Sequence, residues 1–159
     1  MQILHLNVSP GGIPKRAVTE ALLTPTGLAG DAHEHPQIHG GPDKAILLIT
    51  SEGLEELRAL GYDVYPGALG ENFTTSGLDR RQIRVGNRYQ AGRVVIEITR
   101  LRTPCSTLDV FNAPGLPPIQ DAIDPEEPSR WGLSGFYARV VNDGLVRAGD
   151  RITLLDALA

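Results

Sequence analysis

The single cysteine, Cys105, has the best-defined reactive chemistry of any residue in this 159-residue chain. Arg100 and Arg102 precede it and Ser106 and Thr107 follow it, so positive charge favours the thiolate and hydroxyls can donate to it. The residue directly before it is a proline, which stiffens the backbone on the approach. One cysteine cannot close an internal disulfide. The thiol is therefore a buried small hydrophobe, a reactive group or a metal ligand, and its neighbours leave all three open.

Two glycine-containing segments are candidates for binding an anionic ligand. In His39-Gly40-Gly41-Pro42-Asp43-Lys44, the adjacent glycines let a ligand approach backbone N–H groups, and Lys44 offers positive charge to a phosphate. In Gly70-Glu71-Asn72-Phe73, the Asn72 amide can bond the edge of a heterocycle or satisfy a backbone group at the start of a strand. A glycine turn before a strand also explains the first segment, so neither motif alone identifies a ligand.

Three histidines, His33, His35 and His39, fall within one loop segment. Their spacing can gather imidazole nitrogens around zinc or copper. Histidine is also a common turn or surface residue, and no cysteine or paired downstream histidine completes a four-ligand zinc set. Both interpretations of the three histidines stay open.

The composition indicates one globular domain made of short strands. Hydrophobic residues are 41% and charged residues 21% of the 159, which suits a single packed domain. The 18 glycines and 12 prolines are plentiful and aromatic residues are only 5%, as expected where tight turns join many strands. A helical bundle is therefore disfavoured.

The charge and hydropathy patterns bear on whether the chain binds nucleic acid or a membrane. The net charge is -4, and no run of Lys or Arg forms a footprint for a polyanion, so nucleic acid is not expected as a partner. The start of the chain lacks the pattern of a signal peptide, and no apolar stretch approaches the roughly 20 residues that span a bilayer. We therefore expect no membrane association and a cytoplasmic location.

Hydrophobic periodicity predicts the elements that position these residues. One helix is expected after Thr50-Ser51, with Leu54, Leu57 and Leu60 on its apolar face and Gly61 at its end. Irregular segments are expected at 27–43 and 112–130, the second as an excursion outside the sheet. Strands are predicted at Gln2–Val8, Ala17–Leu23, Lys44–Ile49, from Asn72 onward, and at Arg93–Leu101, Gly135–Val141 and Arg151–Leu155. Cys105 then lies just past the end of the clearest strand.

The order of four short stretches resembles the MOSC domain, named for the C-terminal domain of molybdenum cofactor sulfurases. They are Gly27-Leu28-Ala29-Gly30-Asp31 with His39-Gly40-Gly41, Pro66-Gly67 through Gly70-Glu71-Asn72-Phe73, Arg102-Thr103-Pro104-Cys105, and Gly135-Phe136-Tyr137-Ala138-Arg139-Val140 with Gly144 and Gly149-Asp150. The resemblance implies a single MOSC-like domain over 1–159, of the stand-alone bacterial type. It also implies a mainly β fold centred on a β-barrel like that of pyruvate kinase, with a few short helices.

The resemblance further implies a pocket for the molybdenum pterin cofactor. The family cysteine matches Cys105, which would be the catalytic residue and the molybdenum ligand of a reductase of N-hydroxylated compounds. Pterin and phosphate would be held by the residues His39, Gly40, Gly41, Lys44, Asn72 and Arg102, with Arg139 as a further candidate. Such a reductase needs a separate electron-donor protein, because the chain shows no flavin, haem or iron–sulfur motif.

Two alternatives remain beside the reductase. Cys105 can carry sulfur as a persulfide received from a sulfur donor and pass it to a metal centre, without durable cofactor binding. The chain can also be a non-catalytic cofactor-binding or interaction module that contacts a partner enzyme through residues 113–130. Pyridoxal phosphate is not expected, because in the wider family it belongs to a separate sulfurase domain.

Overall fold

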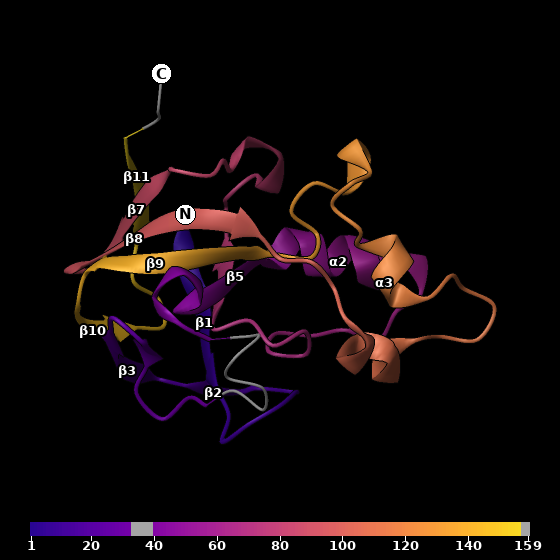
Figure 1. Cartoon of the computed structure of the whole chain (residues 1–159), viewed down its shortest axis with the longest axis horizontal. Coiled ribbons are helices and arrows are strands. Elements are labelled where there is room, and N and C mark those ends of the chain that lie inside the picture. Colours follow the sequence, from indigo (N-terminus) through magenta and orange to yellow (C-terminus); the bar gives the residue numbers. More distant parts are fainter. Residues whose placement is uncertain (33–39, 157–159) are drawn as a thin grey trace.

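The structure is a computed structural model that describes residues 1–32 and 40–156 (Figure 1). The predictions made for His33, His35 and His39 lie outside the described residues.

A large curved sheet dominates the molecule. It has eight strands in the order β11-β7-β8-β9-β5-β6-β1-β2. All neighbouring pairs are antiparallel except β5 and β6, which are parallel and are linked through the helix α2. The strand bounds are β1 (Gln2–Val8), β2 (Arg16–Val18), β5 (Ile46–Thr50), β6 (Phe73–Ser76), β7 (Arg88–Ala91), β8 (Val94–Leu101), β9 (Phe136–Asn142) and β11 (Ile152–Asp156).

A second sheet lies at one end of the large one. It has three strands in the order β10-β3-β4, namely β3 (Glu20–Thr24), β4 (Gly27–Leu28) and β10 (Gly144–Arg147). β1, the strand next to the edge strand β2, approaches the segment before β11 through an isolated bridge between Gln2 and Arg151, where the Ile3 N–H donates to the Asp150 carbonyl at 2.9 Å. The predicted mainly β fold with few short helices is confirmed, although one bridge does not make the sheet a closed barrel.

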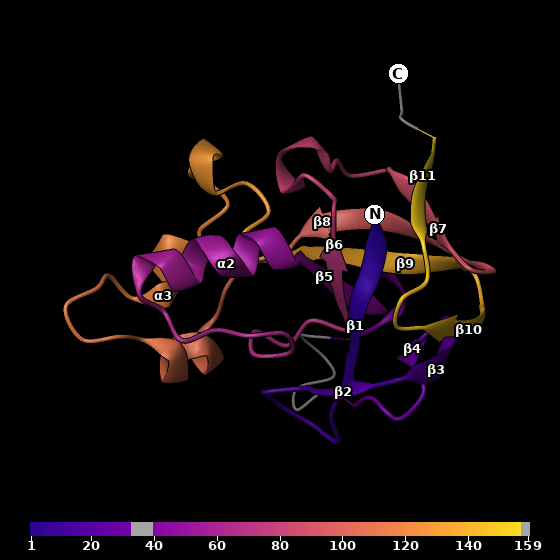
Figure 2. The ribbon, with the colours of Figure 1, turned by 180° about the vertical axis from the view of Figure 1, so that it is seen from behind.

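The two α-helices, α2 (Ser51–Leu60) and α3 (Ile119–Ala122), lie on one side of the molecule, away from β3, β10 and β11 (Figures 1 and 2). The predicted helix is α2 (Ser51–Leu60), whose first turn is capped by the Thr50 hydroxyl accepting from Gly53 N–H and whose end is Gly61 in the left-handed region. The remaining helical turns are the 3₁₀ segments η1 (Pro42–Lys44), η2 (Arg80–Gln82), η3 (Ser106–Phe111) and η4 (Pro128–Arg130), and the short helix α3 (Ile119–Ala122).

The protein has two hydrophobic clusters, one within the sheet and one on the side of α2 and α3. The first lies inside the curved sheet, and alternation along β8 supplies Val94, Ile96 and Ile98 to it. The second packs α2 against the excursion after Cys105 and includes Leu57, Leu108, Ile119 and Leu133. The helical side therefore has its own hydrophobic core, which holds the segment after Cys105 in place.

Two predicted elements differ from those observed. The strand expected at Ala17–Leu23 is two strands, because β2 pairs with β1 while β3 pairs with β10 in the other sheet. Lys44 belongs to η1 and not to the strand that follows it.

Candidate functional site

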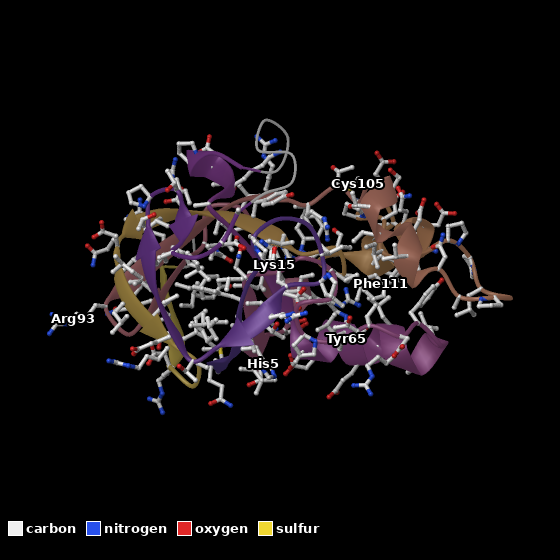
Figure 3. All side chains as sticks on the ribbon, turned by 90° about the horizontal axis from the view of Figure 1, so that it is seen from below. His5, Lys15, Tyr65, Arg93, Cys105 and Phe111 are labelled. Carbon is white, nitrogen blue, oxygen red and sulfur yellow. The ribbon has the colours of Figure 1, made fainter. Side chains whose placement is uncertain are left out.

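Cys105 lies where the β8–β9 ladder ends. The Arg102 N–H donates to the Gly135 carbonyl at 2.9 Å, so the pairing continues one step past Leu101, the last residue of β8. Cys105 then has extended backbone and immediately precedes η3. Its side chain is half-buried, with Sγ 2.8 Å from Thr107 Oγ1. Figure 3 shows Cys105 at the start of the segment that leads to Phe111.

Arg102 places a buried positive charge beside this thiol. Only 5% of the residue is exposed. Its Nη1 donates to the Ser134 carbonyl at 3.3 Å, whereas its buried Nε has no partner among residues 1–32 and 40–156. Burial lowers the pKa of the guanidinium, and negative charge on Tyr137, Cys105 and Glu71 opposes this. A buried cation with an unpaired donor is costly, and an anionic ligand would relieve that cost.

Tyr137 joins the cluster through the register of the sheet. It pairs with Arg100 on β8 and with Leu47 on β5. Side chains alternate along extended chain, so Arg100 and Arg102 share the face that Tyr137 occupies. The Lys44 ammonium lies 5.2 Å from the centre of the Tyr137 ring, a cation–π distance. The sheet therefore gathers Cys105, Arg102 and Tyr137, with Lys44 against the tyrosine ring.

Asn72 lies beside Leu47, the β5 residue that pairs with Tyr137, but its side chain is hydrogen-bonded within the protein. Its Oδ1 accepts from the Leu47 N–H at 3.0 Å. Its Nδ2 donates to the Asn7 carbonyl at 3.2 Å and to the Asp31 carboxylate at 2.9 Å. These bonds match the backbone-satisfying role that the sequence left open for Asn72. They fix the turn before β6 and leave little of the amide for a ligand.

A buried ion pair stands behind Asn72. Lys15 Nζ lies 2.6 Å from Asp31 Oδ1, and the side chains are only 6% and 4% exposed. The same carboxylate oxygen accepts from the Ser9 N–H at 3.0 Å. Asp31 therefore ties three separate segments together at the point where the chain enters residues 33–39.

Glu71 is a second buried carboxylate of the cluster. Its Oε1 accepts from the Gly67 N–H at 2.6 Å and from the Thr74 hydroxyl at 3.0 Å. Its Oε2 has no partner within the described ranges. Burial raises the pKa of Glu71 from 4.5 to about 6, while the Arg102 cation is among the groups that act in the opposite direction.

The remaining predicted site residues lie at different places. Gly41 precedes η1 with φ of 103°, a conformation that favours glycine, and Gly40 comes directly before it. Lys44 ends η1 and faces Tyr137. Arg139 does not join the Cys105 cluster, because its exposed guanidinium pairs with Glu97 on β8.

The donor set fits a cofactor that brings most of its own metal ligands. In the part of the chain that the structure describes, no three His, Cys, Asp or Glu side chains gather to hold a metal ion. A metal beside Cys105 would therefore have one thiolate from the protein and further ligands from a bound molecule. The buried Arg102 charge and its unpaired Nε suit a negatively charged molecule of that kind.

Comparison with known protein families matches the MOSC domain over residues 35–153, well over half of the chain. This chain belongs to the MOSC domain family. The family is associated with binding of the molybdenum cofactor.

Several MOSC relatives resemble the chain over most of its length. The Bacillus subtilis protein YflK is 30% identical over 148 residues, which are 91% of this chain and 63% of YflK. The Escherichia coli protein YiiM is 31% identical over 105 residues, 63% of this chain and 47% of YiiM. The matched regions therefore span less than two thirds of either relative.

A solved structure and a fungal protein extend the comparison. The crystal structure of YiiM from Geobacillus stearothermophilus superposes with a TM-score of 0.75 at 29% identity, covering 98% of this chain and 75% of that one. A Gibberella moniliformis protein named Reductase is 31% identical over 139 residues, which are 82% of this chain but 23% of the fungal protein.

Sequence reasoning missed part of the cluster. Lys15, Asp31, Glu71 and Tyr137 were not predicted as site residues, although the last three lie inside the stretches that resemble the MOSC domain. Their proximity depends on pairings between distant strands, which no local pattern reveals.

Among the described helices, none is long and apolar enough to cross a membrane.

Proposed function

We propose that this MOSC domain binds the molybdenum pterin cofactor, with Cys105 as the protein ligand of the metal, and reduces N-hydroxylated compounds. The observation that carries the proposal is the half-buried thiol beside a buried arginine whose Nε lacks a partner among the described residues. A thiolate suits a soft metal environment, and an unpaired guanidinium donor suits an anionic cofactor.

The residues of the cluster have separate roles in this proposal. Cys105 holds the metal, Arg102 donates to the anionic part of the cofactor, and Lys44 with the Gly40-Gly41 backbone offers further donors. When bound, the cofactor supplies a metal centre that passes two electrons to the substrate. His39 and Asn72 stay weaker members of the predicted set, and Arg139 is left out because Glu97 already pairs with it.

The electrons must come from a partner protein in this scheme. The chain shows no motif of its own for flavin, haem or an iron–sulfur cluster. We therefore propose a separate electron-donor protein. The name of the Gibberella moniliformis relative, Reductase, supports the reaction class.

The first test is molybdenum and pterin content after expression in a host that makes the cofactor. We expect stoichiometric molybdenum in the wild type and loss of at least about nine tenths of it in Cys105→Ser, because the serine hydroxyl is a poor replacement for a thiolate ligand. Ser106→Ala is the matched control, since it changes a neighbouring hydroxyl and leaves the thiol in place. Well-loaded hosts that yield wild-type protein without molybdenum or pterin would rule the proposal out.

A sulfur carrier is the second candidate, favoured by the partial exposure of the same thiol. Cys105–SH would react with a donor persulfide R–S–SH to give Cys105–S–SH and R–SH, and would then pass the outer sulfur on. Mass spectrometry after incubation with such a donor should detect one added sulfur atom on Cys105. Metal-free wild-type protein that gains this sulfur, with no gain in Cys105→Ser, would favour the carrier over the reductase.

A further inference from the structure

Tyr137 is the one phenol beside Cys105 and Arg102 in the described cluster, and the proposed cofactor binding makes no use of it. It is 8% exposed and is held from three sides. Its backbone pairs with Arg100 and Leu47 in the sheet, its carbonyl accepts from the Thr99 hydroxyl at 3.2 Å, and its ring lies under the Lys44 ammonium at 5.2 Å. The ring is therefore fixed in place by groups that do not involve the hydroxyl.

The hydroxyl itself is unused by the described part of the protein. Among residues 1–32 and 40–156, no group forms a hydrogen bond with the Tyr137 hydroxyl. Tyr137 lies opposite Arg100 in the β8–β9 ladder, and Arg102 is two residues further along the extended chain, so all three side chains lie on the same face of the sheet. A held ring with an unpaired hydroxyl at a proposed reaction centre is an arrangement suited to donating a proton.

We propose that Tyr137 is a catalytic residue that donates a proton to the substrate oxygen during reduction of an N-hydroxylated compound. This inference rests on the proposed function of the site. The overall change is R₂N–OH plus two electrons and two protons to R₂N–H and water, with the electrons coming from the partner electron-transfer protein.

The proton balance assigns Tyr137 one of the two protons. As the N–O bond breaks, the phenol proton moves to the departing oxygen, and the second proton comes from solvent. The phenolate then recovers a proton from water. Arg102 stabilises this phenolate by its positive charge, and Lys44 is held over the same ring.

The electrostatics keep the phenol in its protonated form before the reaction. Burial raises the pKa of Tyr137 above 10, the Arg102 and Arg100 cations lower it, and Cys105 charge raises it. The hydroxyl therefore carries its proton throughout the neutral range. It can therefore act as a proton donor at neutral pH.

The electrostatic part is tested on the chain without cofactor, by NMR titration of tyrosines labelled at the ring carbon that bears the hydroxyl. Tyr137→Phe assigns the signal by its disappearance. We expect Arg102→Gln to raise the Tyr137 pKa and Cys105→Ala to lower it, because the first removes a cation and the second a negative charge. Tyr89, which is also buried but on β7, is the internal reference and should not move. A Tyr137 pKa unchanged in both variants overturns the inference.

The catalytic part is tested on protein loaded with molybdenum. Tyr137→Phe removes only the hydroxyl, and we expect full molybdenum content with a fall in kcat of about 100-fold or more at similar KM. Tyr89→Phe should keep wild-type kcat. Normal kcat in loaded Tyr137→Phe overturns the role of Tyr137 alone. Wild-type protein that holds no molybdenum overturns the proposed function and this inference with it.

Discussion

At the scale of single residues, the desolvation of buried charged groups is the main energetic cost of the site. Lys15, Asp31, Glu71 and Arg102 are all nearly or fully enclosed. Lys15 and Asp31 offset each other at 2.6 Å, whereas Arg102 and Glu71 each keep a buried polar atom without a partner among the described residues. The Lys15–Asp31 pair is therefore satisfied in the apoprotein. The unpartnered atoms of Arg102 and Glu71 are expected to bond a ligand or water.

The Lys15–Asp31 pair allows a direct test of this difference. We expect Lys15→Met to lower the free energy of unfolding by roughly 3 kcal/mol, because it leaves a buried carboxylate without its counter-charge. Urea denaturation at neutral pH measures the change. Arg147→Ala breaks an ion pair whose side chains are 60% and 51% exposed, and it should cost less than about 1 kcal/mol. Equal losses of unfolding free energy in the two variants would show that burial does not determine how much the Lys15–Asp31 pair contributes to stability.

At the scale of elements, close backbone contacts position the turn that carries Glu71. Gly67 has φ of 89°, and a Cβ there would lie 2.2 Å from the Lys15 carbonyl oxygen. The Lys15 N–H also donates to the Gly67 carbonyl at 2.8 Å. The turn before β6 and the segment before β2 are therefore in direct backbone contact, which is possible only because residue 67 lacks a side chain.

This contact makes Gly67→Ala a severe substitution. We expect a loss of more than about 2 kcal/mol of unfolding free energy, from the left-handed conformation together with the collision with a carbonyl oxygen. Thermal and urea unfolding measure it. Gly115→Ala is the matched control. Gly115 has φ of 78°, but a Cβ there would meet none of the described residues within 4 Å, so only the conformational cost of about 1 kcal/mol applies. Comparable losses would refute the role of the Lys15 contact.

The sequence predicted elements better than the contacts between them. Alternation identified all of β1 and all of β8, the latter with one extra residue at its start, and the Thr50 cap and Gly61 bounded α2, because each of these signals is local. The division of Ala17–Leu23 between two sheets depends on β1 and β10, which no local pattern specifies. Cys105 could be singled out from its neighbours, whereas Tyr137 becomes a site residue only through its pairing with Arg100.

At the scale of the whole molecule, the buried Glu71 makes stability depend on pH. Its pKa is raised from 4.5 to about 6, so the folded state binds this proton more tightly than the unfolded state. The contribution is therefore fully present below about pH 4.5 and is lost as the pH rises through 6, by roughly 2 kcal/mol. Glu97 has the opposite slope, because its hydrogen bond with Arg88 lowers its pKa.

Comparing wild type with Glu71→Gln isolates the Glu71 effect. We expect the difference in unfolding free energy between the two proteins to change across pH 4.5–6 and to be constant above pH 7, since Glu97 and the other groups cancel. Urea denaturation at a series of pH values gives this difference curve. A flat difference across the whole range would mean that Glu71 titrates alike in the folded and unfolded chain.

The bridge between Gln2 and Arg151 has a consequence for how the protein is made. β1 leaves the ribosome shortly before β2, which pairs with residues 6–8, but its partners in β6 and around residue 150 follow much later. Throughout that interval Ile3, which is fully buried in the finished domain, lies on the part of β1 that β2 does not pair with. A growing chain therefore exposes an apolar, partly unpaired strand until the segment around residue 150 has been made, and is an expected client for chaperones that bind nascent apolar strands.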